Sequence, residues 1–400
     1  MKPLVRILLL VTLAALASSV AVSPASAGKQ MEVAVQDDGL FIFQDHSNRE
    51  LALSRARAMG VTHIRMNVLW WQPIPASQRN QTTTPSPIRY NWGPWDDAIA
   101  RANAWGIKTQ LDLTGDPPAW ACGNKAPPYA CDGFRPSIPL FQHFVASAAQ
   151  HFKGRVSRYS LWNEPNWYTW LSPHDEAPIL YRNLYMTGYD AIKSIDPGAE
   201  VVMGETAPHF QPNISTPPLK FIREMVCVNK KLKRIKGAKK KCLGGPLKLD
   251  AYATHPYDFT HKPTKRLENP DELTMANIRR LPKLLKKLRK KGLIEPSKKR
   301  FPIYLTEQGY FVGGRRGVPE RRRAEWIVQA WQMAQDARRV KQMLHYVFVS
   351  PPASSPSAYF DMGLIAQNGT PRTSYFALRN WIQQAVAAGK LARPGPCSAC

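Results

Sequence analysis

The 400-residue sequence lacks the short motifs that mark several common classes of enzyme. It has no His-Glu-x-x-His zinc motif, no Gly-x-Ser-x-Gly turn, no Walker loop for phosphate and no glycine pattern for a dinucleotide. Its nine histidines form no cluster with the spacing of metal ligands. These absences argue against zinc, serine-nucleophile and nucleotide chemistry, and we expect neither a metal ion nor a cofactor.

Acidic residues are scarce beside basic ones. The chain has 29 Asp and Glu against 55 Lys and Arg, a formal net charge of +26. Residues 220–300 alone hold 25 basic and 7 acidic residues, a local charge of 25 − 7 = +18, with the densest runs at 230–241 and 283–300. This segment predicts a surface that binds an anionic polysaccharide or cell envelope, and the alternative is a solvated helix face and loop. Nucleic acid is not expected as a partner, because the basic runs contain few aromatic residues and no known binding motif.

Long apolar runs are absent beyond the N-terminal region. The run at 7–22 follows Lys2 and Arg6 and precedes Ala25-Ser26-Ala27, the pattern of a secretory signal with its cleavage site. A membrane anchor is the alternative, but the run is shorter than the roughly 20 residues that span a bilayer. We therefore expect a signal peptide at 1–27, a secreted mature protein, and no membrane span after cleavage.

Cysteines are few and closely spaced in pairs. Six cysteines allow fifteen connectivities, and local spacing favours Cys122 with Cys131, Cys227 with Cys242, and Cys397 with Cys400. The last pair resembles half of a metal site, but no second pair has a suitable spacing. For the C-terminal tail, 391–400, a disulfide or two free thiols are the expected states.

Strand-like and helix-like patterns alternate along the remaining chain. Eight apolar segments read as strands, at 31–35, 61–69, 107–113, 156–162, 200–203, 249–254, 301–306 and 343–349. Helical patterns lie between them, at 47–59, 93–105, 140–152, 177–195, 273–291 and 323–340. This alternation predicts an α/β fold, a single-domain (β/α)8 TIM barrel over 28–390. Periodicity also allows a doubly wound open sheet. We expect a monomer.

Two of these strands end in a glutamate. Asn163-Glu164-Pro165 closes the strand at 156–162, and Glu307-Gln308-Gly309-Tyr310 follows the strand at 301–306. Pro165 cannot donate a hydrogen bond to a neighbouring strand, so the strand ends there with its carboxylate presented. In a barrel, chemistry lies at the carboxyl ends of the strands, where we expect both glutamates.

The two motifs together resemble clan A of the glycoside hydrolases, retaining β-glycosidases built on a TIM barrel, and within it cellulase-like and family 39 members. The resemblance covers nearly the whole mature chain. It implies that Glu164 is the general acid/base and Glu307 the nucleophile of a secreted enzyme that degrades a β-linked poly- or oligosaccharide with retention. The alternative from another class is a barrel that binds polysaccharide or cell envelope through its basic surface without catalysis.

The resemblance also implies substrate-binding roles for other residues. Arg65, inside the strand at 61–69, matches an arginine beside the nucleophile, and Asn163 matches an asparagine that binds the sugar 2-hydroxyl. His255 and Tyr257, after the strand at 249–254, match residues that border the nucleophile. The alternatives are a partly exposed Arg65, a turn role for Asn163 and a structural role for His255.

A third acid and several aromatic residues complete the predicted site. Glu205 ends the strand candidate at 200–203 and could orient substrate, raise the pKa of Glu164, or point into a loop. Aromatic platforms for sugar rings are expected at strand exits, at Trp70, Trp167 and Tyr310. Clan members often carry a Trp at the end of strand 8, which this chain lacks, and Phe348 is the expected substitute. That difference leaves the identity of the sugar open.

Overall fold

A computed structural model of the chain describes residues 30–123, 131, 133–235, 242, 244–296 and 300–400. The predicted signal peptide at 1–27 lies outside the described residues. So do residues 236–241 and 297–299, which belong to the two basic runs.

Eight parallel strands close into a barrel in the order β1, β10, β9, β7, β5, β4, β3, β2. Closure occurs at β1, where Val35 pairs with His345 of β10 on one side and with Ile64 of β2 on the other. The open doubly wound sheet is therefore wrong, and the predicted (β/α)8 fold is confirmed. The strands are β1 (Glu32–Gln36), β2 (His63–Leu69), β3 (Lys108–Thr114), β4 (Arg158–Leu161), β5 (Glu200–Thr206), β7 (Ala251–Thr254), β9 (Ile303–Leu305) and β10 (Val340–Tyr346).

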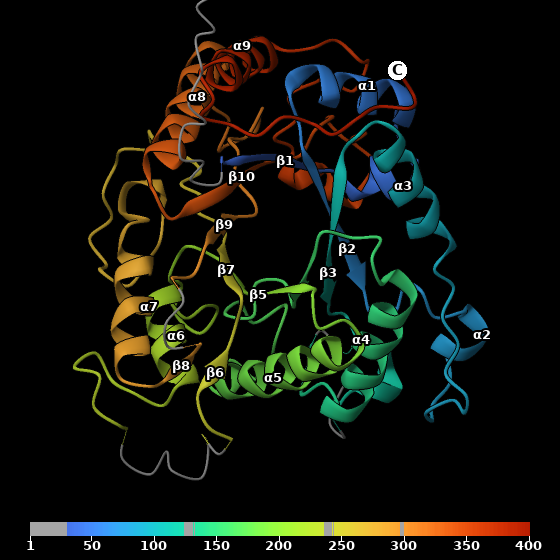
Figure 1. Cartoon of the computed structure of the whole chain (residues 1–400), viewed down its shortest axis with the longest axis vertical. Coiled ribbons are helices and arrows are strands. Elements are labelled where there is room, and N and C mark those ends of the chain that lie inside the picture. The colour runs from blue at the N-terminus through green and yellow to red at the C-terminus, as the bar shows by residue number, and fades with distance from the viewer. Residues whose placement is uncertain (1–29, 124–130, 132, 236–241, 243, 297–299) are drawn as a thin grey trace, which may run out of the picture.

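Helices form a ring around these strands (Figure 1). Local sequence sets their ends. The first helix begins after Asn48, whose side chain accepts a hydrogen bond from the N–H of Leu51, and it ends at Gly60, which has a φ of 102°. The helices are α1 (Arg49–Met59), α2 (Ala76–Arg79), α3 (Gly93–Ala104), α4 (Ile138–Phe152), α5 (Ala177–Ile195), α6 (Pro218–Met225), α7 (Arg280–Lys290), α8 (Glu320–Asp336) and α9 (Thr373–Ala387).

Several boundaries differ from the sequence-based expectation; the helix predicted at 323–340, for example, begins at Glu320 and ends at Asp336, and Val340 begins β10. Strand β10 ends at Tyr346, and the apolar residues 347–349 are buried beyond it, with the N–H of Val349 donating to Asp37 Oδ2 at 2.9 Å. An apolar run thus predicts burial there but not strand pairing. The helix predicted at 273–291 is wrong at its start, because a 3-10 turn, Met275–Asn277, precedes α7. Helices α6 and α9 are not among those that the periodicity predicts, and neither are the two strands of a small separate sheet, β6 (Leu247–Lys248) and β8 (Ile294–Glu295).

A buried polar layer fills the barrel near the amino ends of its strands. Arg158 donates from Nη1 to Glu32 Oε2 at 2.7 Å and from Nε to Glu200 Oε2 at 3.1 Å, and its guanidinium lies over the ring of Tyr304. Burial acts to raise the pKa of Glu32, but the charge of Arg158 and its hydrogen bond help to outweigh it, so this pKa is lowered. This layer joins β1, β4 and β5 at the amino ends of the strands, whereas the predicted site lies at their carboxyl ends.

The three predicted cysteine pairs are confirmed as disulfides. Their Cα atoms lie 5.9 Å apart for Cys122 and Cys131, 6.2 Å for Cys227 and Cys242, and 5.6 Å for Cys397 and Cys400, all within the usual range. The tail is therefore oxidised and does not carry free thiols.

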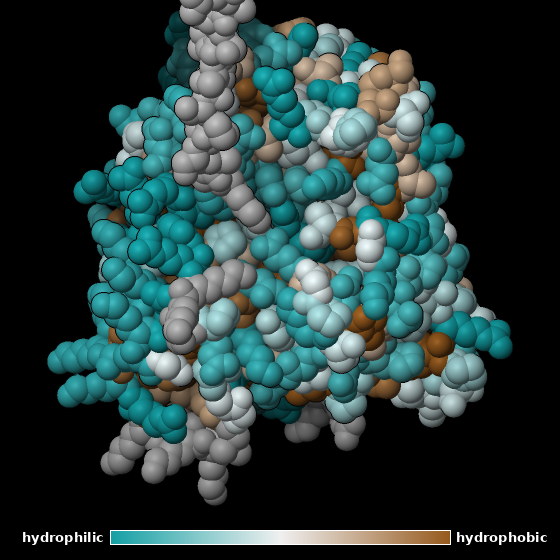
Figure 2. Space-filling view, viewed as in Figure 1, coloured by the Kyte–Doolittle hydropathy of each residue, from teal (hydrophilic) through white to brown (hydrophobic). Residues whose placement is uncertain are grey.

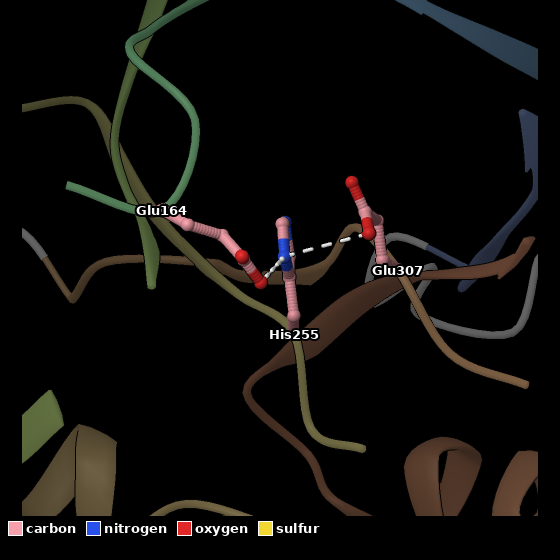
Figure 3. Close-up of side chains that lie close together, drawn as sticks. All are labelled: Glu164, His255 and Glu307. Atoms are coloured by element: carbon pink, nitrogen blue, oxygen red, sulfur yellow. Dashed lines mark hydrogen bonds and ion pairs between the residues drawn. The ribbon is translucent and has the colours of Figure 1, made fainter. Parts of the chain in front are cut away.

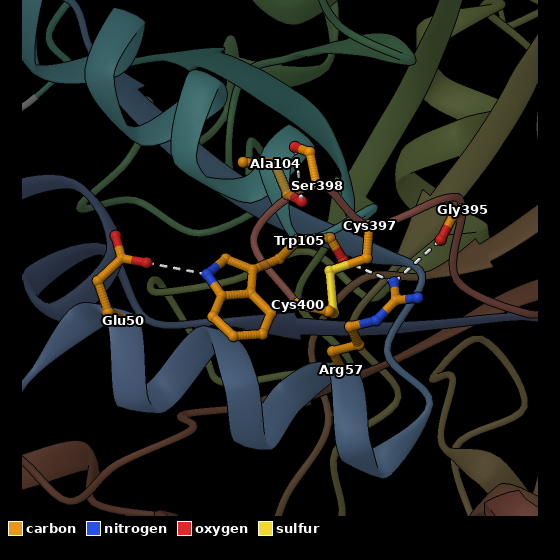
Figure 4. The surroundings of a disulfide bond; sticks show 8 residues. All are labelled: Glu50, Arg57, Ala104, Trp105, Gly395, Cys397, Ser398 and Cys400. Atoms are coloured by element: carbon orange, nitrogen blue, oxygen red, sulfur yellow. Dashed lines mark hydrogen bonds between the residues drawn. A yellow bond between two sulfur atoms is a disulfide. The ribbon is translucent and has the colours of Figure 1, made fainter.

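The C-terminal tail lies against α1 and α3 (Figure 4). Arg57 on α1 donates to the carbonyls of Trp105 and Gly395, and the N–H groups of Ser398 and Ala399 donate to Ala104 at the end of α3. The tail thus joins two helices that are far apart in sequence from it.

Hydrophilic residues cover most of the face seen in Figure 2, and hydrophobic residues appear there as small separate patches. Among the described residues, no helix combines the length and the apolar character that crossing a bilayer requires.

We predict that Gly106→Ala loosens the tail. A Cβ atom at Gly106 would lie 2.4 Å from the carbonyl oxygens of both Gly395 and Pro396, and the residue also has a φ of +67°. Gly154 is the matched control, because its φ is +72° but nothing lies within 4 Å of its Cβ position. We expect Gly154→Ala to cost about 1 kcal/mol and Gly106→Ala about 2–4 kcal/mol, measured by urea unfolding.

Hydrogen exchange identifies the cause of that loss. In Gly106→Ala the amides of Gly395, Ser398 and Ala399, which donate to Gly106 and Ala104, should exchange faster than in the wild type. Equal stability and equal exchange in the two alanine variants would contradict the proposed contact.

Candidate active site

Glu164 and Glu307 both lie at the carboxyl end of the barrel, after β4 and β9 (Figure 3). One carboxylate oxygen of each lies within 4.8 Å of the other. Glu164 has a φ of +38°, and its N–H donates to the carbonyl of Glu205 at 2.9 Å. Its side chain is 19% exposed and that of Glu307 is 11% exposed, so a ligand entering this end of the barrel could reach both.

Arg65 is fully buried on β2 and holds Glu307 in place. Its Nη1 donates to Glu307 Oε1 at 3.0 Å and to Gln36 Oε1 at 2.5 Å, while its Nη2 donates to Asp112 Oδ2 at 3.0 Å and to Asn163 Oδ1 at 2.9 Å. Burial raises the pKa of Glu307, and the charges of His255 and Arg65 act against that rise. The partly exposed alternative for Arg65 is therefore wrong.

His255 connects three carboxylates from the carboxyl end of β7. Its Nδ1 lies 2.9 Å from Glu164 Oε1 and 3.6 Å from Glu307 Oε2 (Figure 3). Its Nε2 lies 3.0 Å from Glu205 Oε2. Burial acts to lower its pKa, but the negative charges and hydrogen bonds of these acids raise it to about 10. His255 is therefore an imidazolium that donates from both nitrogens.

Glu205 is buried in the barrel interior. It is 1% exposed, with a φ of +48°, and its Oε2 accepts hydrogen bonds from His255 and from Thr306 Oγ1, with Arg65 Nη2 at 3.5 Å. Burial acts to raise its pKa, but Arg65 and His255 outweigh burial and lower it to about 2. This geometry makes Glu205 a buried counter-ion of His255 and Arg65, a role that was not among the three considered for it.

Tyr257 and Asn163 complete the contacts around the two glutamates. The hydroxyl of Tyr257 donates to Glu307 Oε2 at 3.1 Å, while its ring stacks on Phe259. The N–H of Asn163 donates to Thr114 Oγ1 at 2.6 Å, and its side-chain oxygen accepts a hydrogen bond from Arg65. The structure thus brings together Arg65, Asn163, Glu164, Glu205, His255, Tyr257 and Glu307.

Two of the three predicted aromatic platforms are buried, and one keeps exposed surface. Trp70 is 0% exposed and packs on Phe144, with ring centroids 5.7 Å apart, and Tyr310 is 1% exposed and packs on Trp326. Neither has a ring face exposed on which a sugar could stack. Trp167 is half-buried and keeps exposed surface close to Glu164 in the chain.

Phe348 does not take the place of the tryptophan that often ends the eighth strand in clan A members. Phe348 is fully buried and packs on Phe41, with centroids 6.1 Å apart, because the chain has already left the barrel at that point. Tyr346 ends β10 instead, and burial together with the charge of Glu307 raises its pKa. Tyr346 is thus the aromatic residue of β10 that is near the nucleophile candidate.

Sequence analysis missed three polar residues of this site, Gln36, Asp112 and Thr306. Asp112 is fully buried between Leu111 and Leu113 on β3, and burial raises its pKa to about 7 although Arg65 acts in the opposite direction. Burial of an acid within an apolar strand costs free energy unless the acid has a partner. The position of Asp112 between two leucines was therefore a signal in the sequence that this acid belongs to a polar site. Gln36 and Thr306 carry no comparable signal, because both occur commonly at strand ends.

The ligand atoms of Glu164, His255 and Glu307 are close enough to hold a metal ion, within 4.8 Å of one another. However, His255 already donates from both ring nitrogens to carboxylates. A metal would require it to lose a proton and one of these bonds. The donor set therefore fits proton and charge transfer between side chains better than metal binding.

No family model matches the chain, and no curated protein is significantly similar to it in sequence. Solved structures share its fold. A family 39 glycoside hydrolase from Bacteroides cellulosilyticus WH2 superposes with a TM-score of 0.61 and 16% identity over 88% of this chain and 63% of its own. A monomeric β-xylosidase from Caulobacter crescentus CB15 superposes with a TM-score of 0.58 and 19% identity, over 88% of this chain and 67% of its own. Xylanase 10B from Thermotoga petrophila RKU-1 superposes with a TM-score of 0.53 and 17% identity, over 89% of this chain and 95% of its own.

These likenesses define the class of fold, the barrel found in clan A glycoside hydrolases, and confirm the resemblance that the two glutamate motifs predict. The chain spans 63% of the length of the Bacteroides protein, so the activity of that whole protein is not transferred with the fold.

The charged state of His255 predicts a specific pH dependence of stability. Its pKa in the folded protein, about 10, lies above the free value of 6.5, so its contribution is fully present below pH 6.5 and is lost as the pH rises through 10. Between pH 7 and 9 this group should lower the free energy of unfolding by up to about 1.4 kcal/mol per pH unit. The His255→Gln variant should lack that slope.

Urea unfolding at pH 6, 7, 8 and 9 checks this prediction. The stability difference between the wild type and His255→Gln should shrink as the pH rises. His143→Gln is the control, because His143 is exposed and its ring forms a hydrogen bond with the hydroxyl of Tyr90 and no ion pair with any described carboxylate. Parallel pH profiles for the wild type and His255→Gln would show that His255 is neutral in the folded protein.

Proposed function

We propose that the chain is a secreted glycoside hydrolase that cleaves β-linked glycosidic bonds of a poly- or oligosaccharide with retention of configuration. The observation that carries the proposal is the pair Glu164 and Glu307, with oxygens within 4.8 Å across the carboxyl end of the barrel. Retaining enzymes hold their two carboxyl groups about 5–5.5 Å apart, whereas inverting enzymes leave a wider gap for water. Three disulfides support export, because such bonds persist in oxidising compartments.

In the first step Glu307 attacks the anomeric carbon while Glu164 protonates the leaving oxygen, which gives a covalent glycosyl-enzyme. Arg65 and Tyr257 each bind one oxygen of Glu307 and so fix its orientation. His255 Nδ1 donates to Glu164 and can stabilise the carboxylate that forms when the proton leaves. With Glu164 in its acid form, Glu205 and Glu307 remain as carboxylates beside both cations, Arg65 and His255, and Asp112 also binds Arg65.

In the second step Glu164, now a carboxylate, takes a proton from water, which attacks the same anomeric carbon and releases Glu307. The names of the similar structures, a β-xylosidase and a xylanase among them, support a β-linkage for the substrate. Asn163 accepts a hydrogen bond from Arg65 and directly precedes Glu164 in the chain, which supports a role for it in binding the sugar hydroxyl next to the anomeric carbon.

The second candidate is a barrel that binds polysaccharide without cleaving it. The net charge of +26 favours this alternative, since it attracts an anionic polymer whether or not catalysis follows. The paired carboxylates with Arg65 and His255 favour the enzyme, because simple binding needs no nucleophile held between two cations.

Tyr257→Phe should move the acid limb of the pH profile of kcat/KM to higher pH by about one unit. Glu307 must be ionised to attack, so activity is lost as the pH falls through its pKa. The Tyr257 hydroxyl donates to the charged form of Glu307, so its removal raises that pKa further above the usual value. Tyr310→Phe is the control, because Tyr310 packs on Trp326. An acid limb at the same pH in both variants would contradict the prediction.

The two catalytic roles are tested with aryl β-glycosides and β-linked polysaccharides, neutral and uronic. Glu164→Ala and Glu307→Ala should each lower kcat/KM by at least about 10³-fold, while the exposed control Glu325→Ala should retain full activity. Added azide should rescue both variants, with a β-glycosyl azide from Glu164→Ala and an α-glycosyl azide from Glu307→Ala. No turnover by the wild type, together with polysaccharide binding that survives both changes, would establish the binding protein instead.

A further inference from the structure

A groove on the outside of the barrel lies between α7 and the end of α8, with a volume of about 630 Å³. Its walls include Ile303 and Val340, which begin β9 and β10. Glu307 follows the other end of β9, about 13 Å along the strand from Ile303. The groove is therefore a separate place from the candidate active site. In Figure 1, α7 and α8 occupy neighbouring places in the ring of helices.

The rim of the groove is strongly cationic. Helix α7 supplies basic residues at positions three or four apart, which places them along one side of the helix, about 5 Å from one another. The segment before β9 and the turn before β10 supply further basic residues. The cationic lining residues are Arg279, Lys283, Lys286, Arg289, Arg300, Arg338 and Arg339.

Few acids line the groove among the described residues. Asp336 is the one acidic lining residue among those described, and its Oδ1 accepts a hydrogen bond from Gln332. Within the described part of the chain, Lys283, Lys286 and Arg338 form no ion pair. Arg339 donates to the carbonyls of Arg300 and Phe301 and to no carboxylate of the described residues. Lys283, Lys286 and Arg338 therefore place positive charge on the groove that no carboxylate of the described residues pairs with.

Arg339 shows the strength of this crowding. Burial lowers its pKa, and the positive charges of Arg300, Arg338 and Arg289 lower it further. A bound anion would relieve that repulsion, because it would place negative charge among the guanidinium groups.

The floor of the groove is apolar. Its lining residues include Leu285 and Pro282 from α7 and Phe301 next to β9. Phe301 is only 5% exposed, so it offers no free aromatic face on which a base could stack. A ligand that fits such a groove needs apolar faces along its body and negative charges at regular intervals on its edges.

We propose that this groove is a second binding site, and that its ligand is an anionic polysaccharide built from uronic acids. Sugar rings present apolar C–H faces, which suit the floor, and a uronic acid chain carries one carboxylate on each ring, which suits the evenly spaced cations of α7. The recess between two helices is less suited to a flat bilayer surface. The groove also includes Arg338 and Arg339, which lie outside the basic segment 220–300 and join it only in the folded chain.

The role of the site depends on the proposed function, although its ligand does not. In a glycoside hydrolase, a chain held about one barrel height from Glu307 would keep the enzyme on an acidic polymer between cleavage events. In a protein without activity, the same groove would still bind the chain.

The test compares two triple variants with the same change in net charge. Lys283→Ser, Lys286→Ser and Arg338→Ser remove three exposed cations from the groove, whereas Lys287→Ser, Lys290→Ser and Lys291→Ser remove three exposed cations that do not line it. All proteins carry Glu307→Ala so that the polymer is not cut. Calorimetric titration with polygalacturonate should show at least a tenfold loss of affinity for the groove variant and less than a threefold loss for the control.

Three further measurements decide the outcome. The same polymer with its carboxyl groups methyl-esterified should bind at least tenfold more weakly to the unsubstituted groove, and equal binding would overturn the proposal. Equal losses in the two triple variants would overturn it too, because net charge alone would then explain binding. Tighter binding to phosphatidylglycerol vesicles or to single-stranded DNA, lost only in the groove variant, would assign the groove to another ligand.

Failure of this proposal differs from failure of the proposed function. With Glu307 restored, the groove variant should hydrolyse small aryl glycosides as fast as the wild type if the enzyme is active. If neither the wild type nor either triple variant hydrolyses a glycoside, but polygalacturonate binding still depends on the groove, the proposed enzymatic function is wrong and the second binding site is supported.

Discussion

Arg65 is a guanidinium group without access to water, and the burial of this charge constrains the carboxyl half of the barrel. A buried cation is costly unless acceptors surround it. Its acceptors come from β1, β3 and the exits of β4 and β9, namely Gln36, Asp112, Asn163 and Glu307. Barrel closure brings these strands together, so the orientation of Glu307 follows from the same contacts that satisfy Arg65. Fold and site are therefore not separable at this position.

The barrel contains two arginine-centred layers with different surroundings. At the amino ends, Arg158 binds Glu32 and Glu200, and His63 lies 3.7 Å from Glu32, but burial lowers the pKa of His63 to about 3 and so keeps it neutral. At the carboxyl ends, Arg65 is joined by His255, whose pKa is raised to about 10 by the acids around it. Glu205, with a pKa of about 2, stays ionised and keeps this second cation in place. The carboxyl end can thus hold charge and protons in a defined arrangement, which acid/base chemistry requires.

The few acids and many bases of the chain are distributed unevenly in space. Acids gather inside the barrel, where Arg65, Arg158 and His255 neutralise them. Many of the bases lie outside, and the groove beside α7 concentrates several of them around an apolar floor. The outward field is therefore positive although the candidate site is nearly balanced. This field would act little on a neutral sugar, whereas it would attract an acidic polymer to the surface before the polymer reached Glu164 and Glu307.

The sequence by itself determined the alternation of eight strands with helices, the cysteine pairs and the place of Glu164 and Glu307. Each depends on local pattern: residues after parallel strands meet at one edge of a sheet wherever the strands lie, and close cysteines pair easily. Only the tertiary structure decided that Glu205 points inward, because its backbone φ of +48° follows from contacts with distant strands. It also decided that Trp70 and Tyr310 are buried, since the helices that cover them come from elsewhere in the chain. Sequence pattern fixes which residues reach a strand end, and long-range packing fixes which way their side chains face.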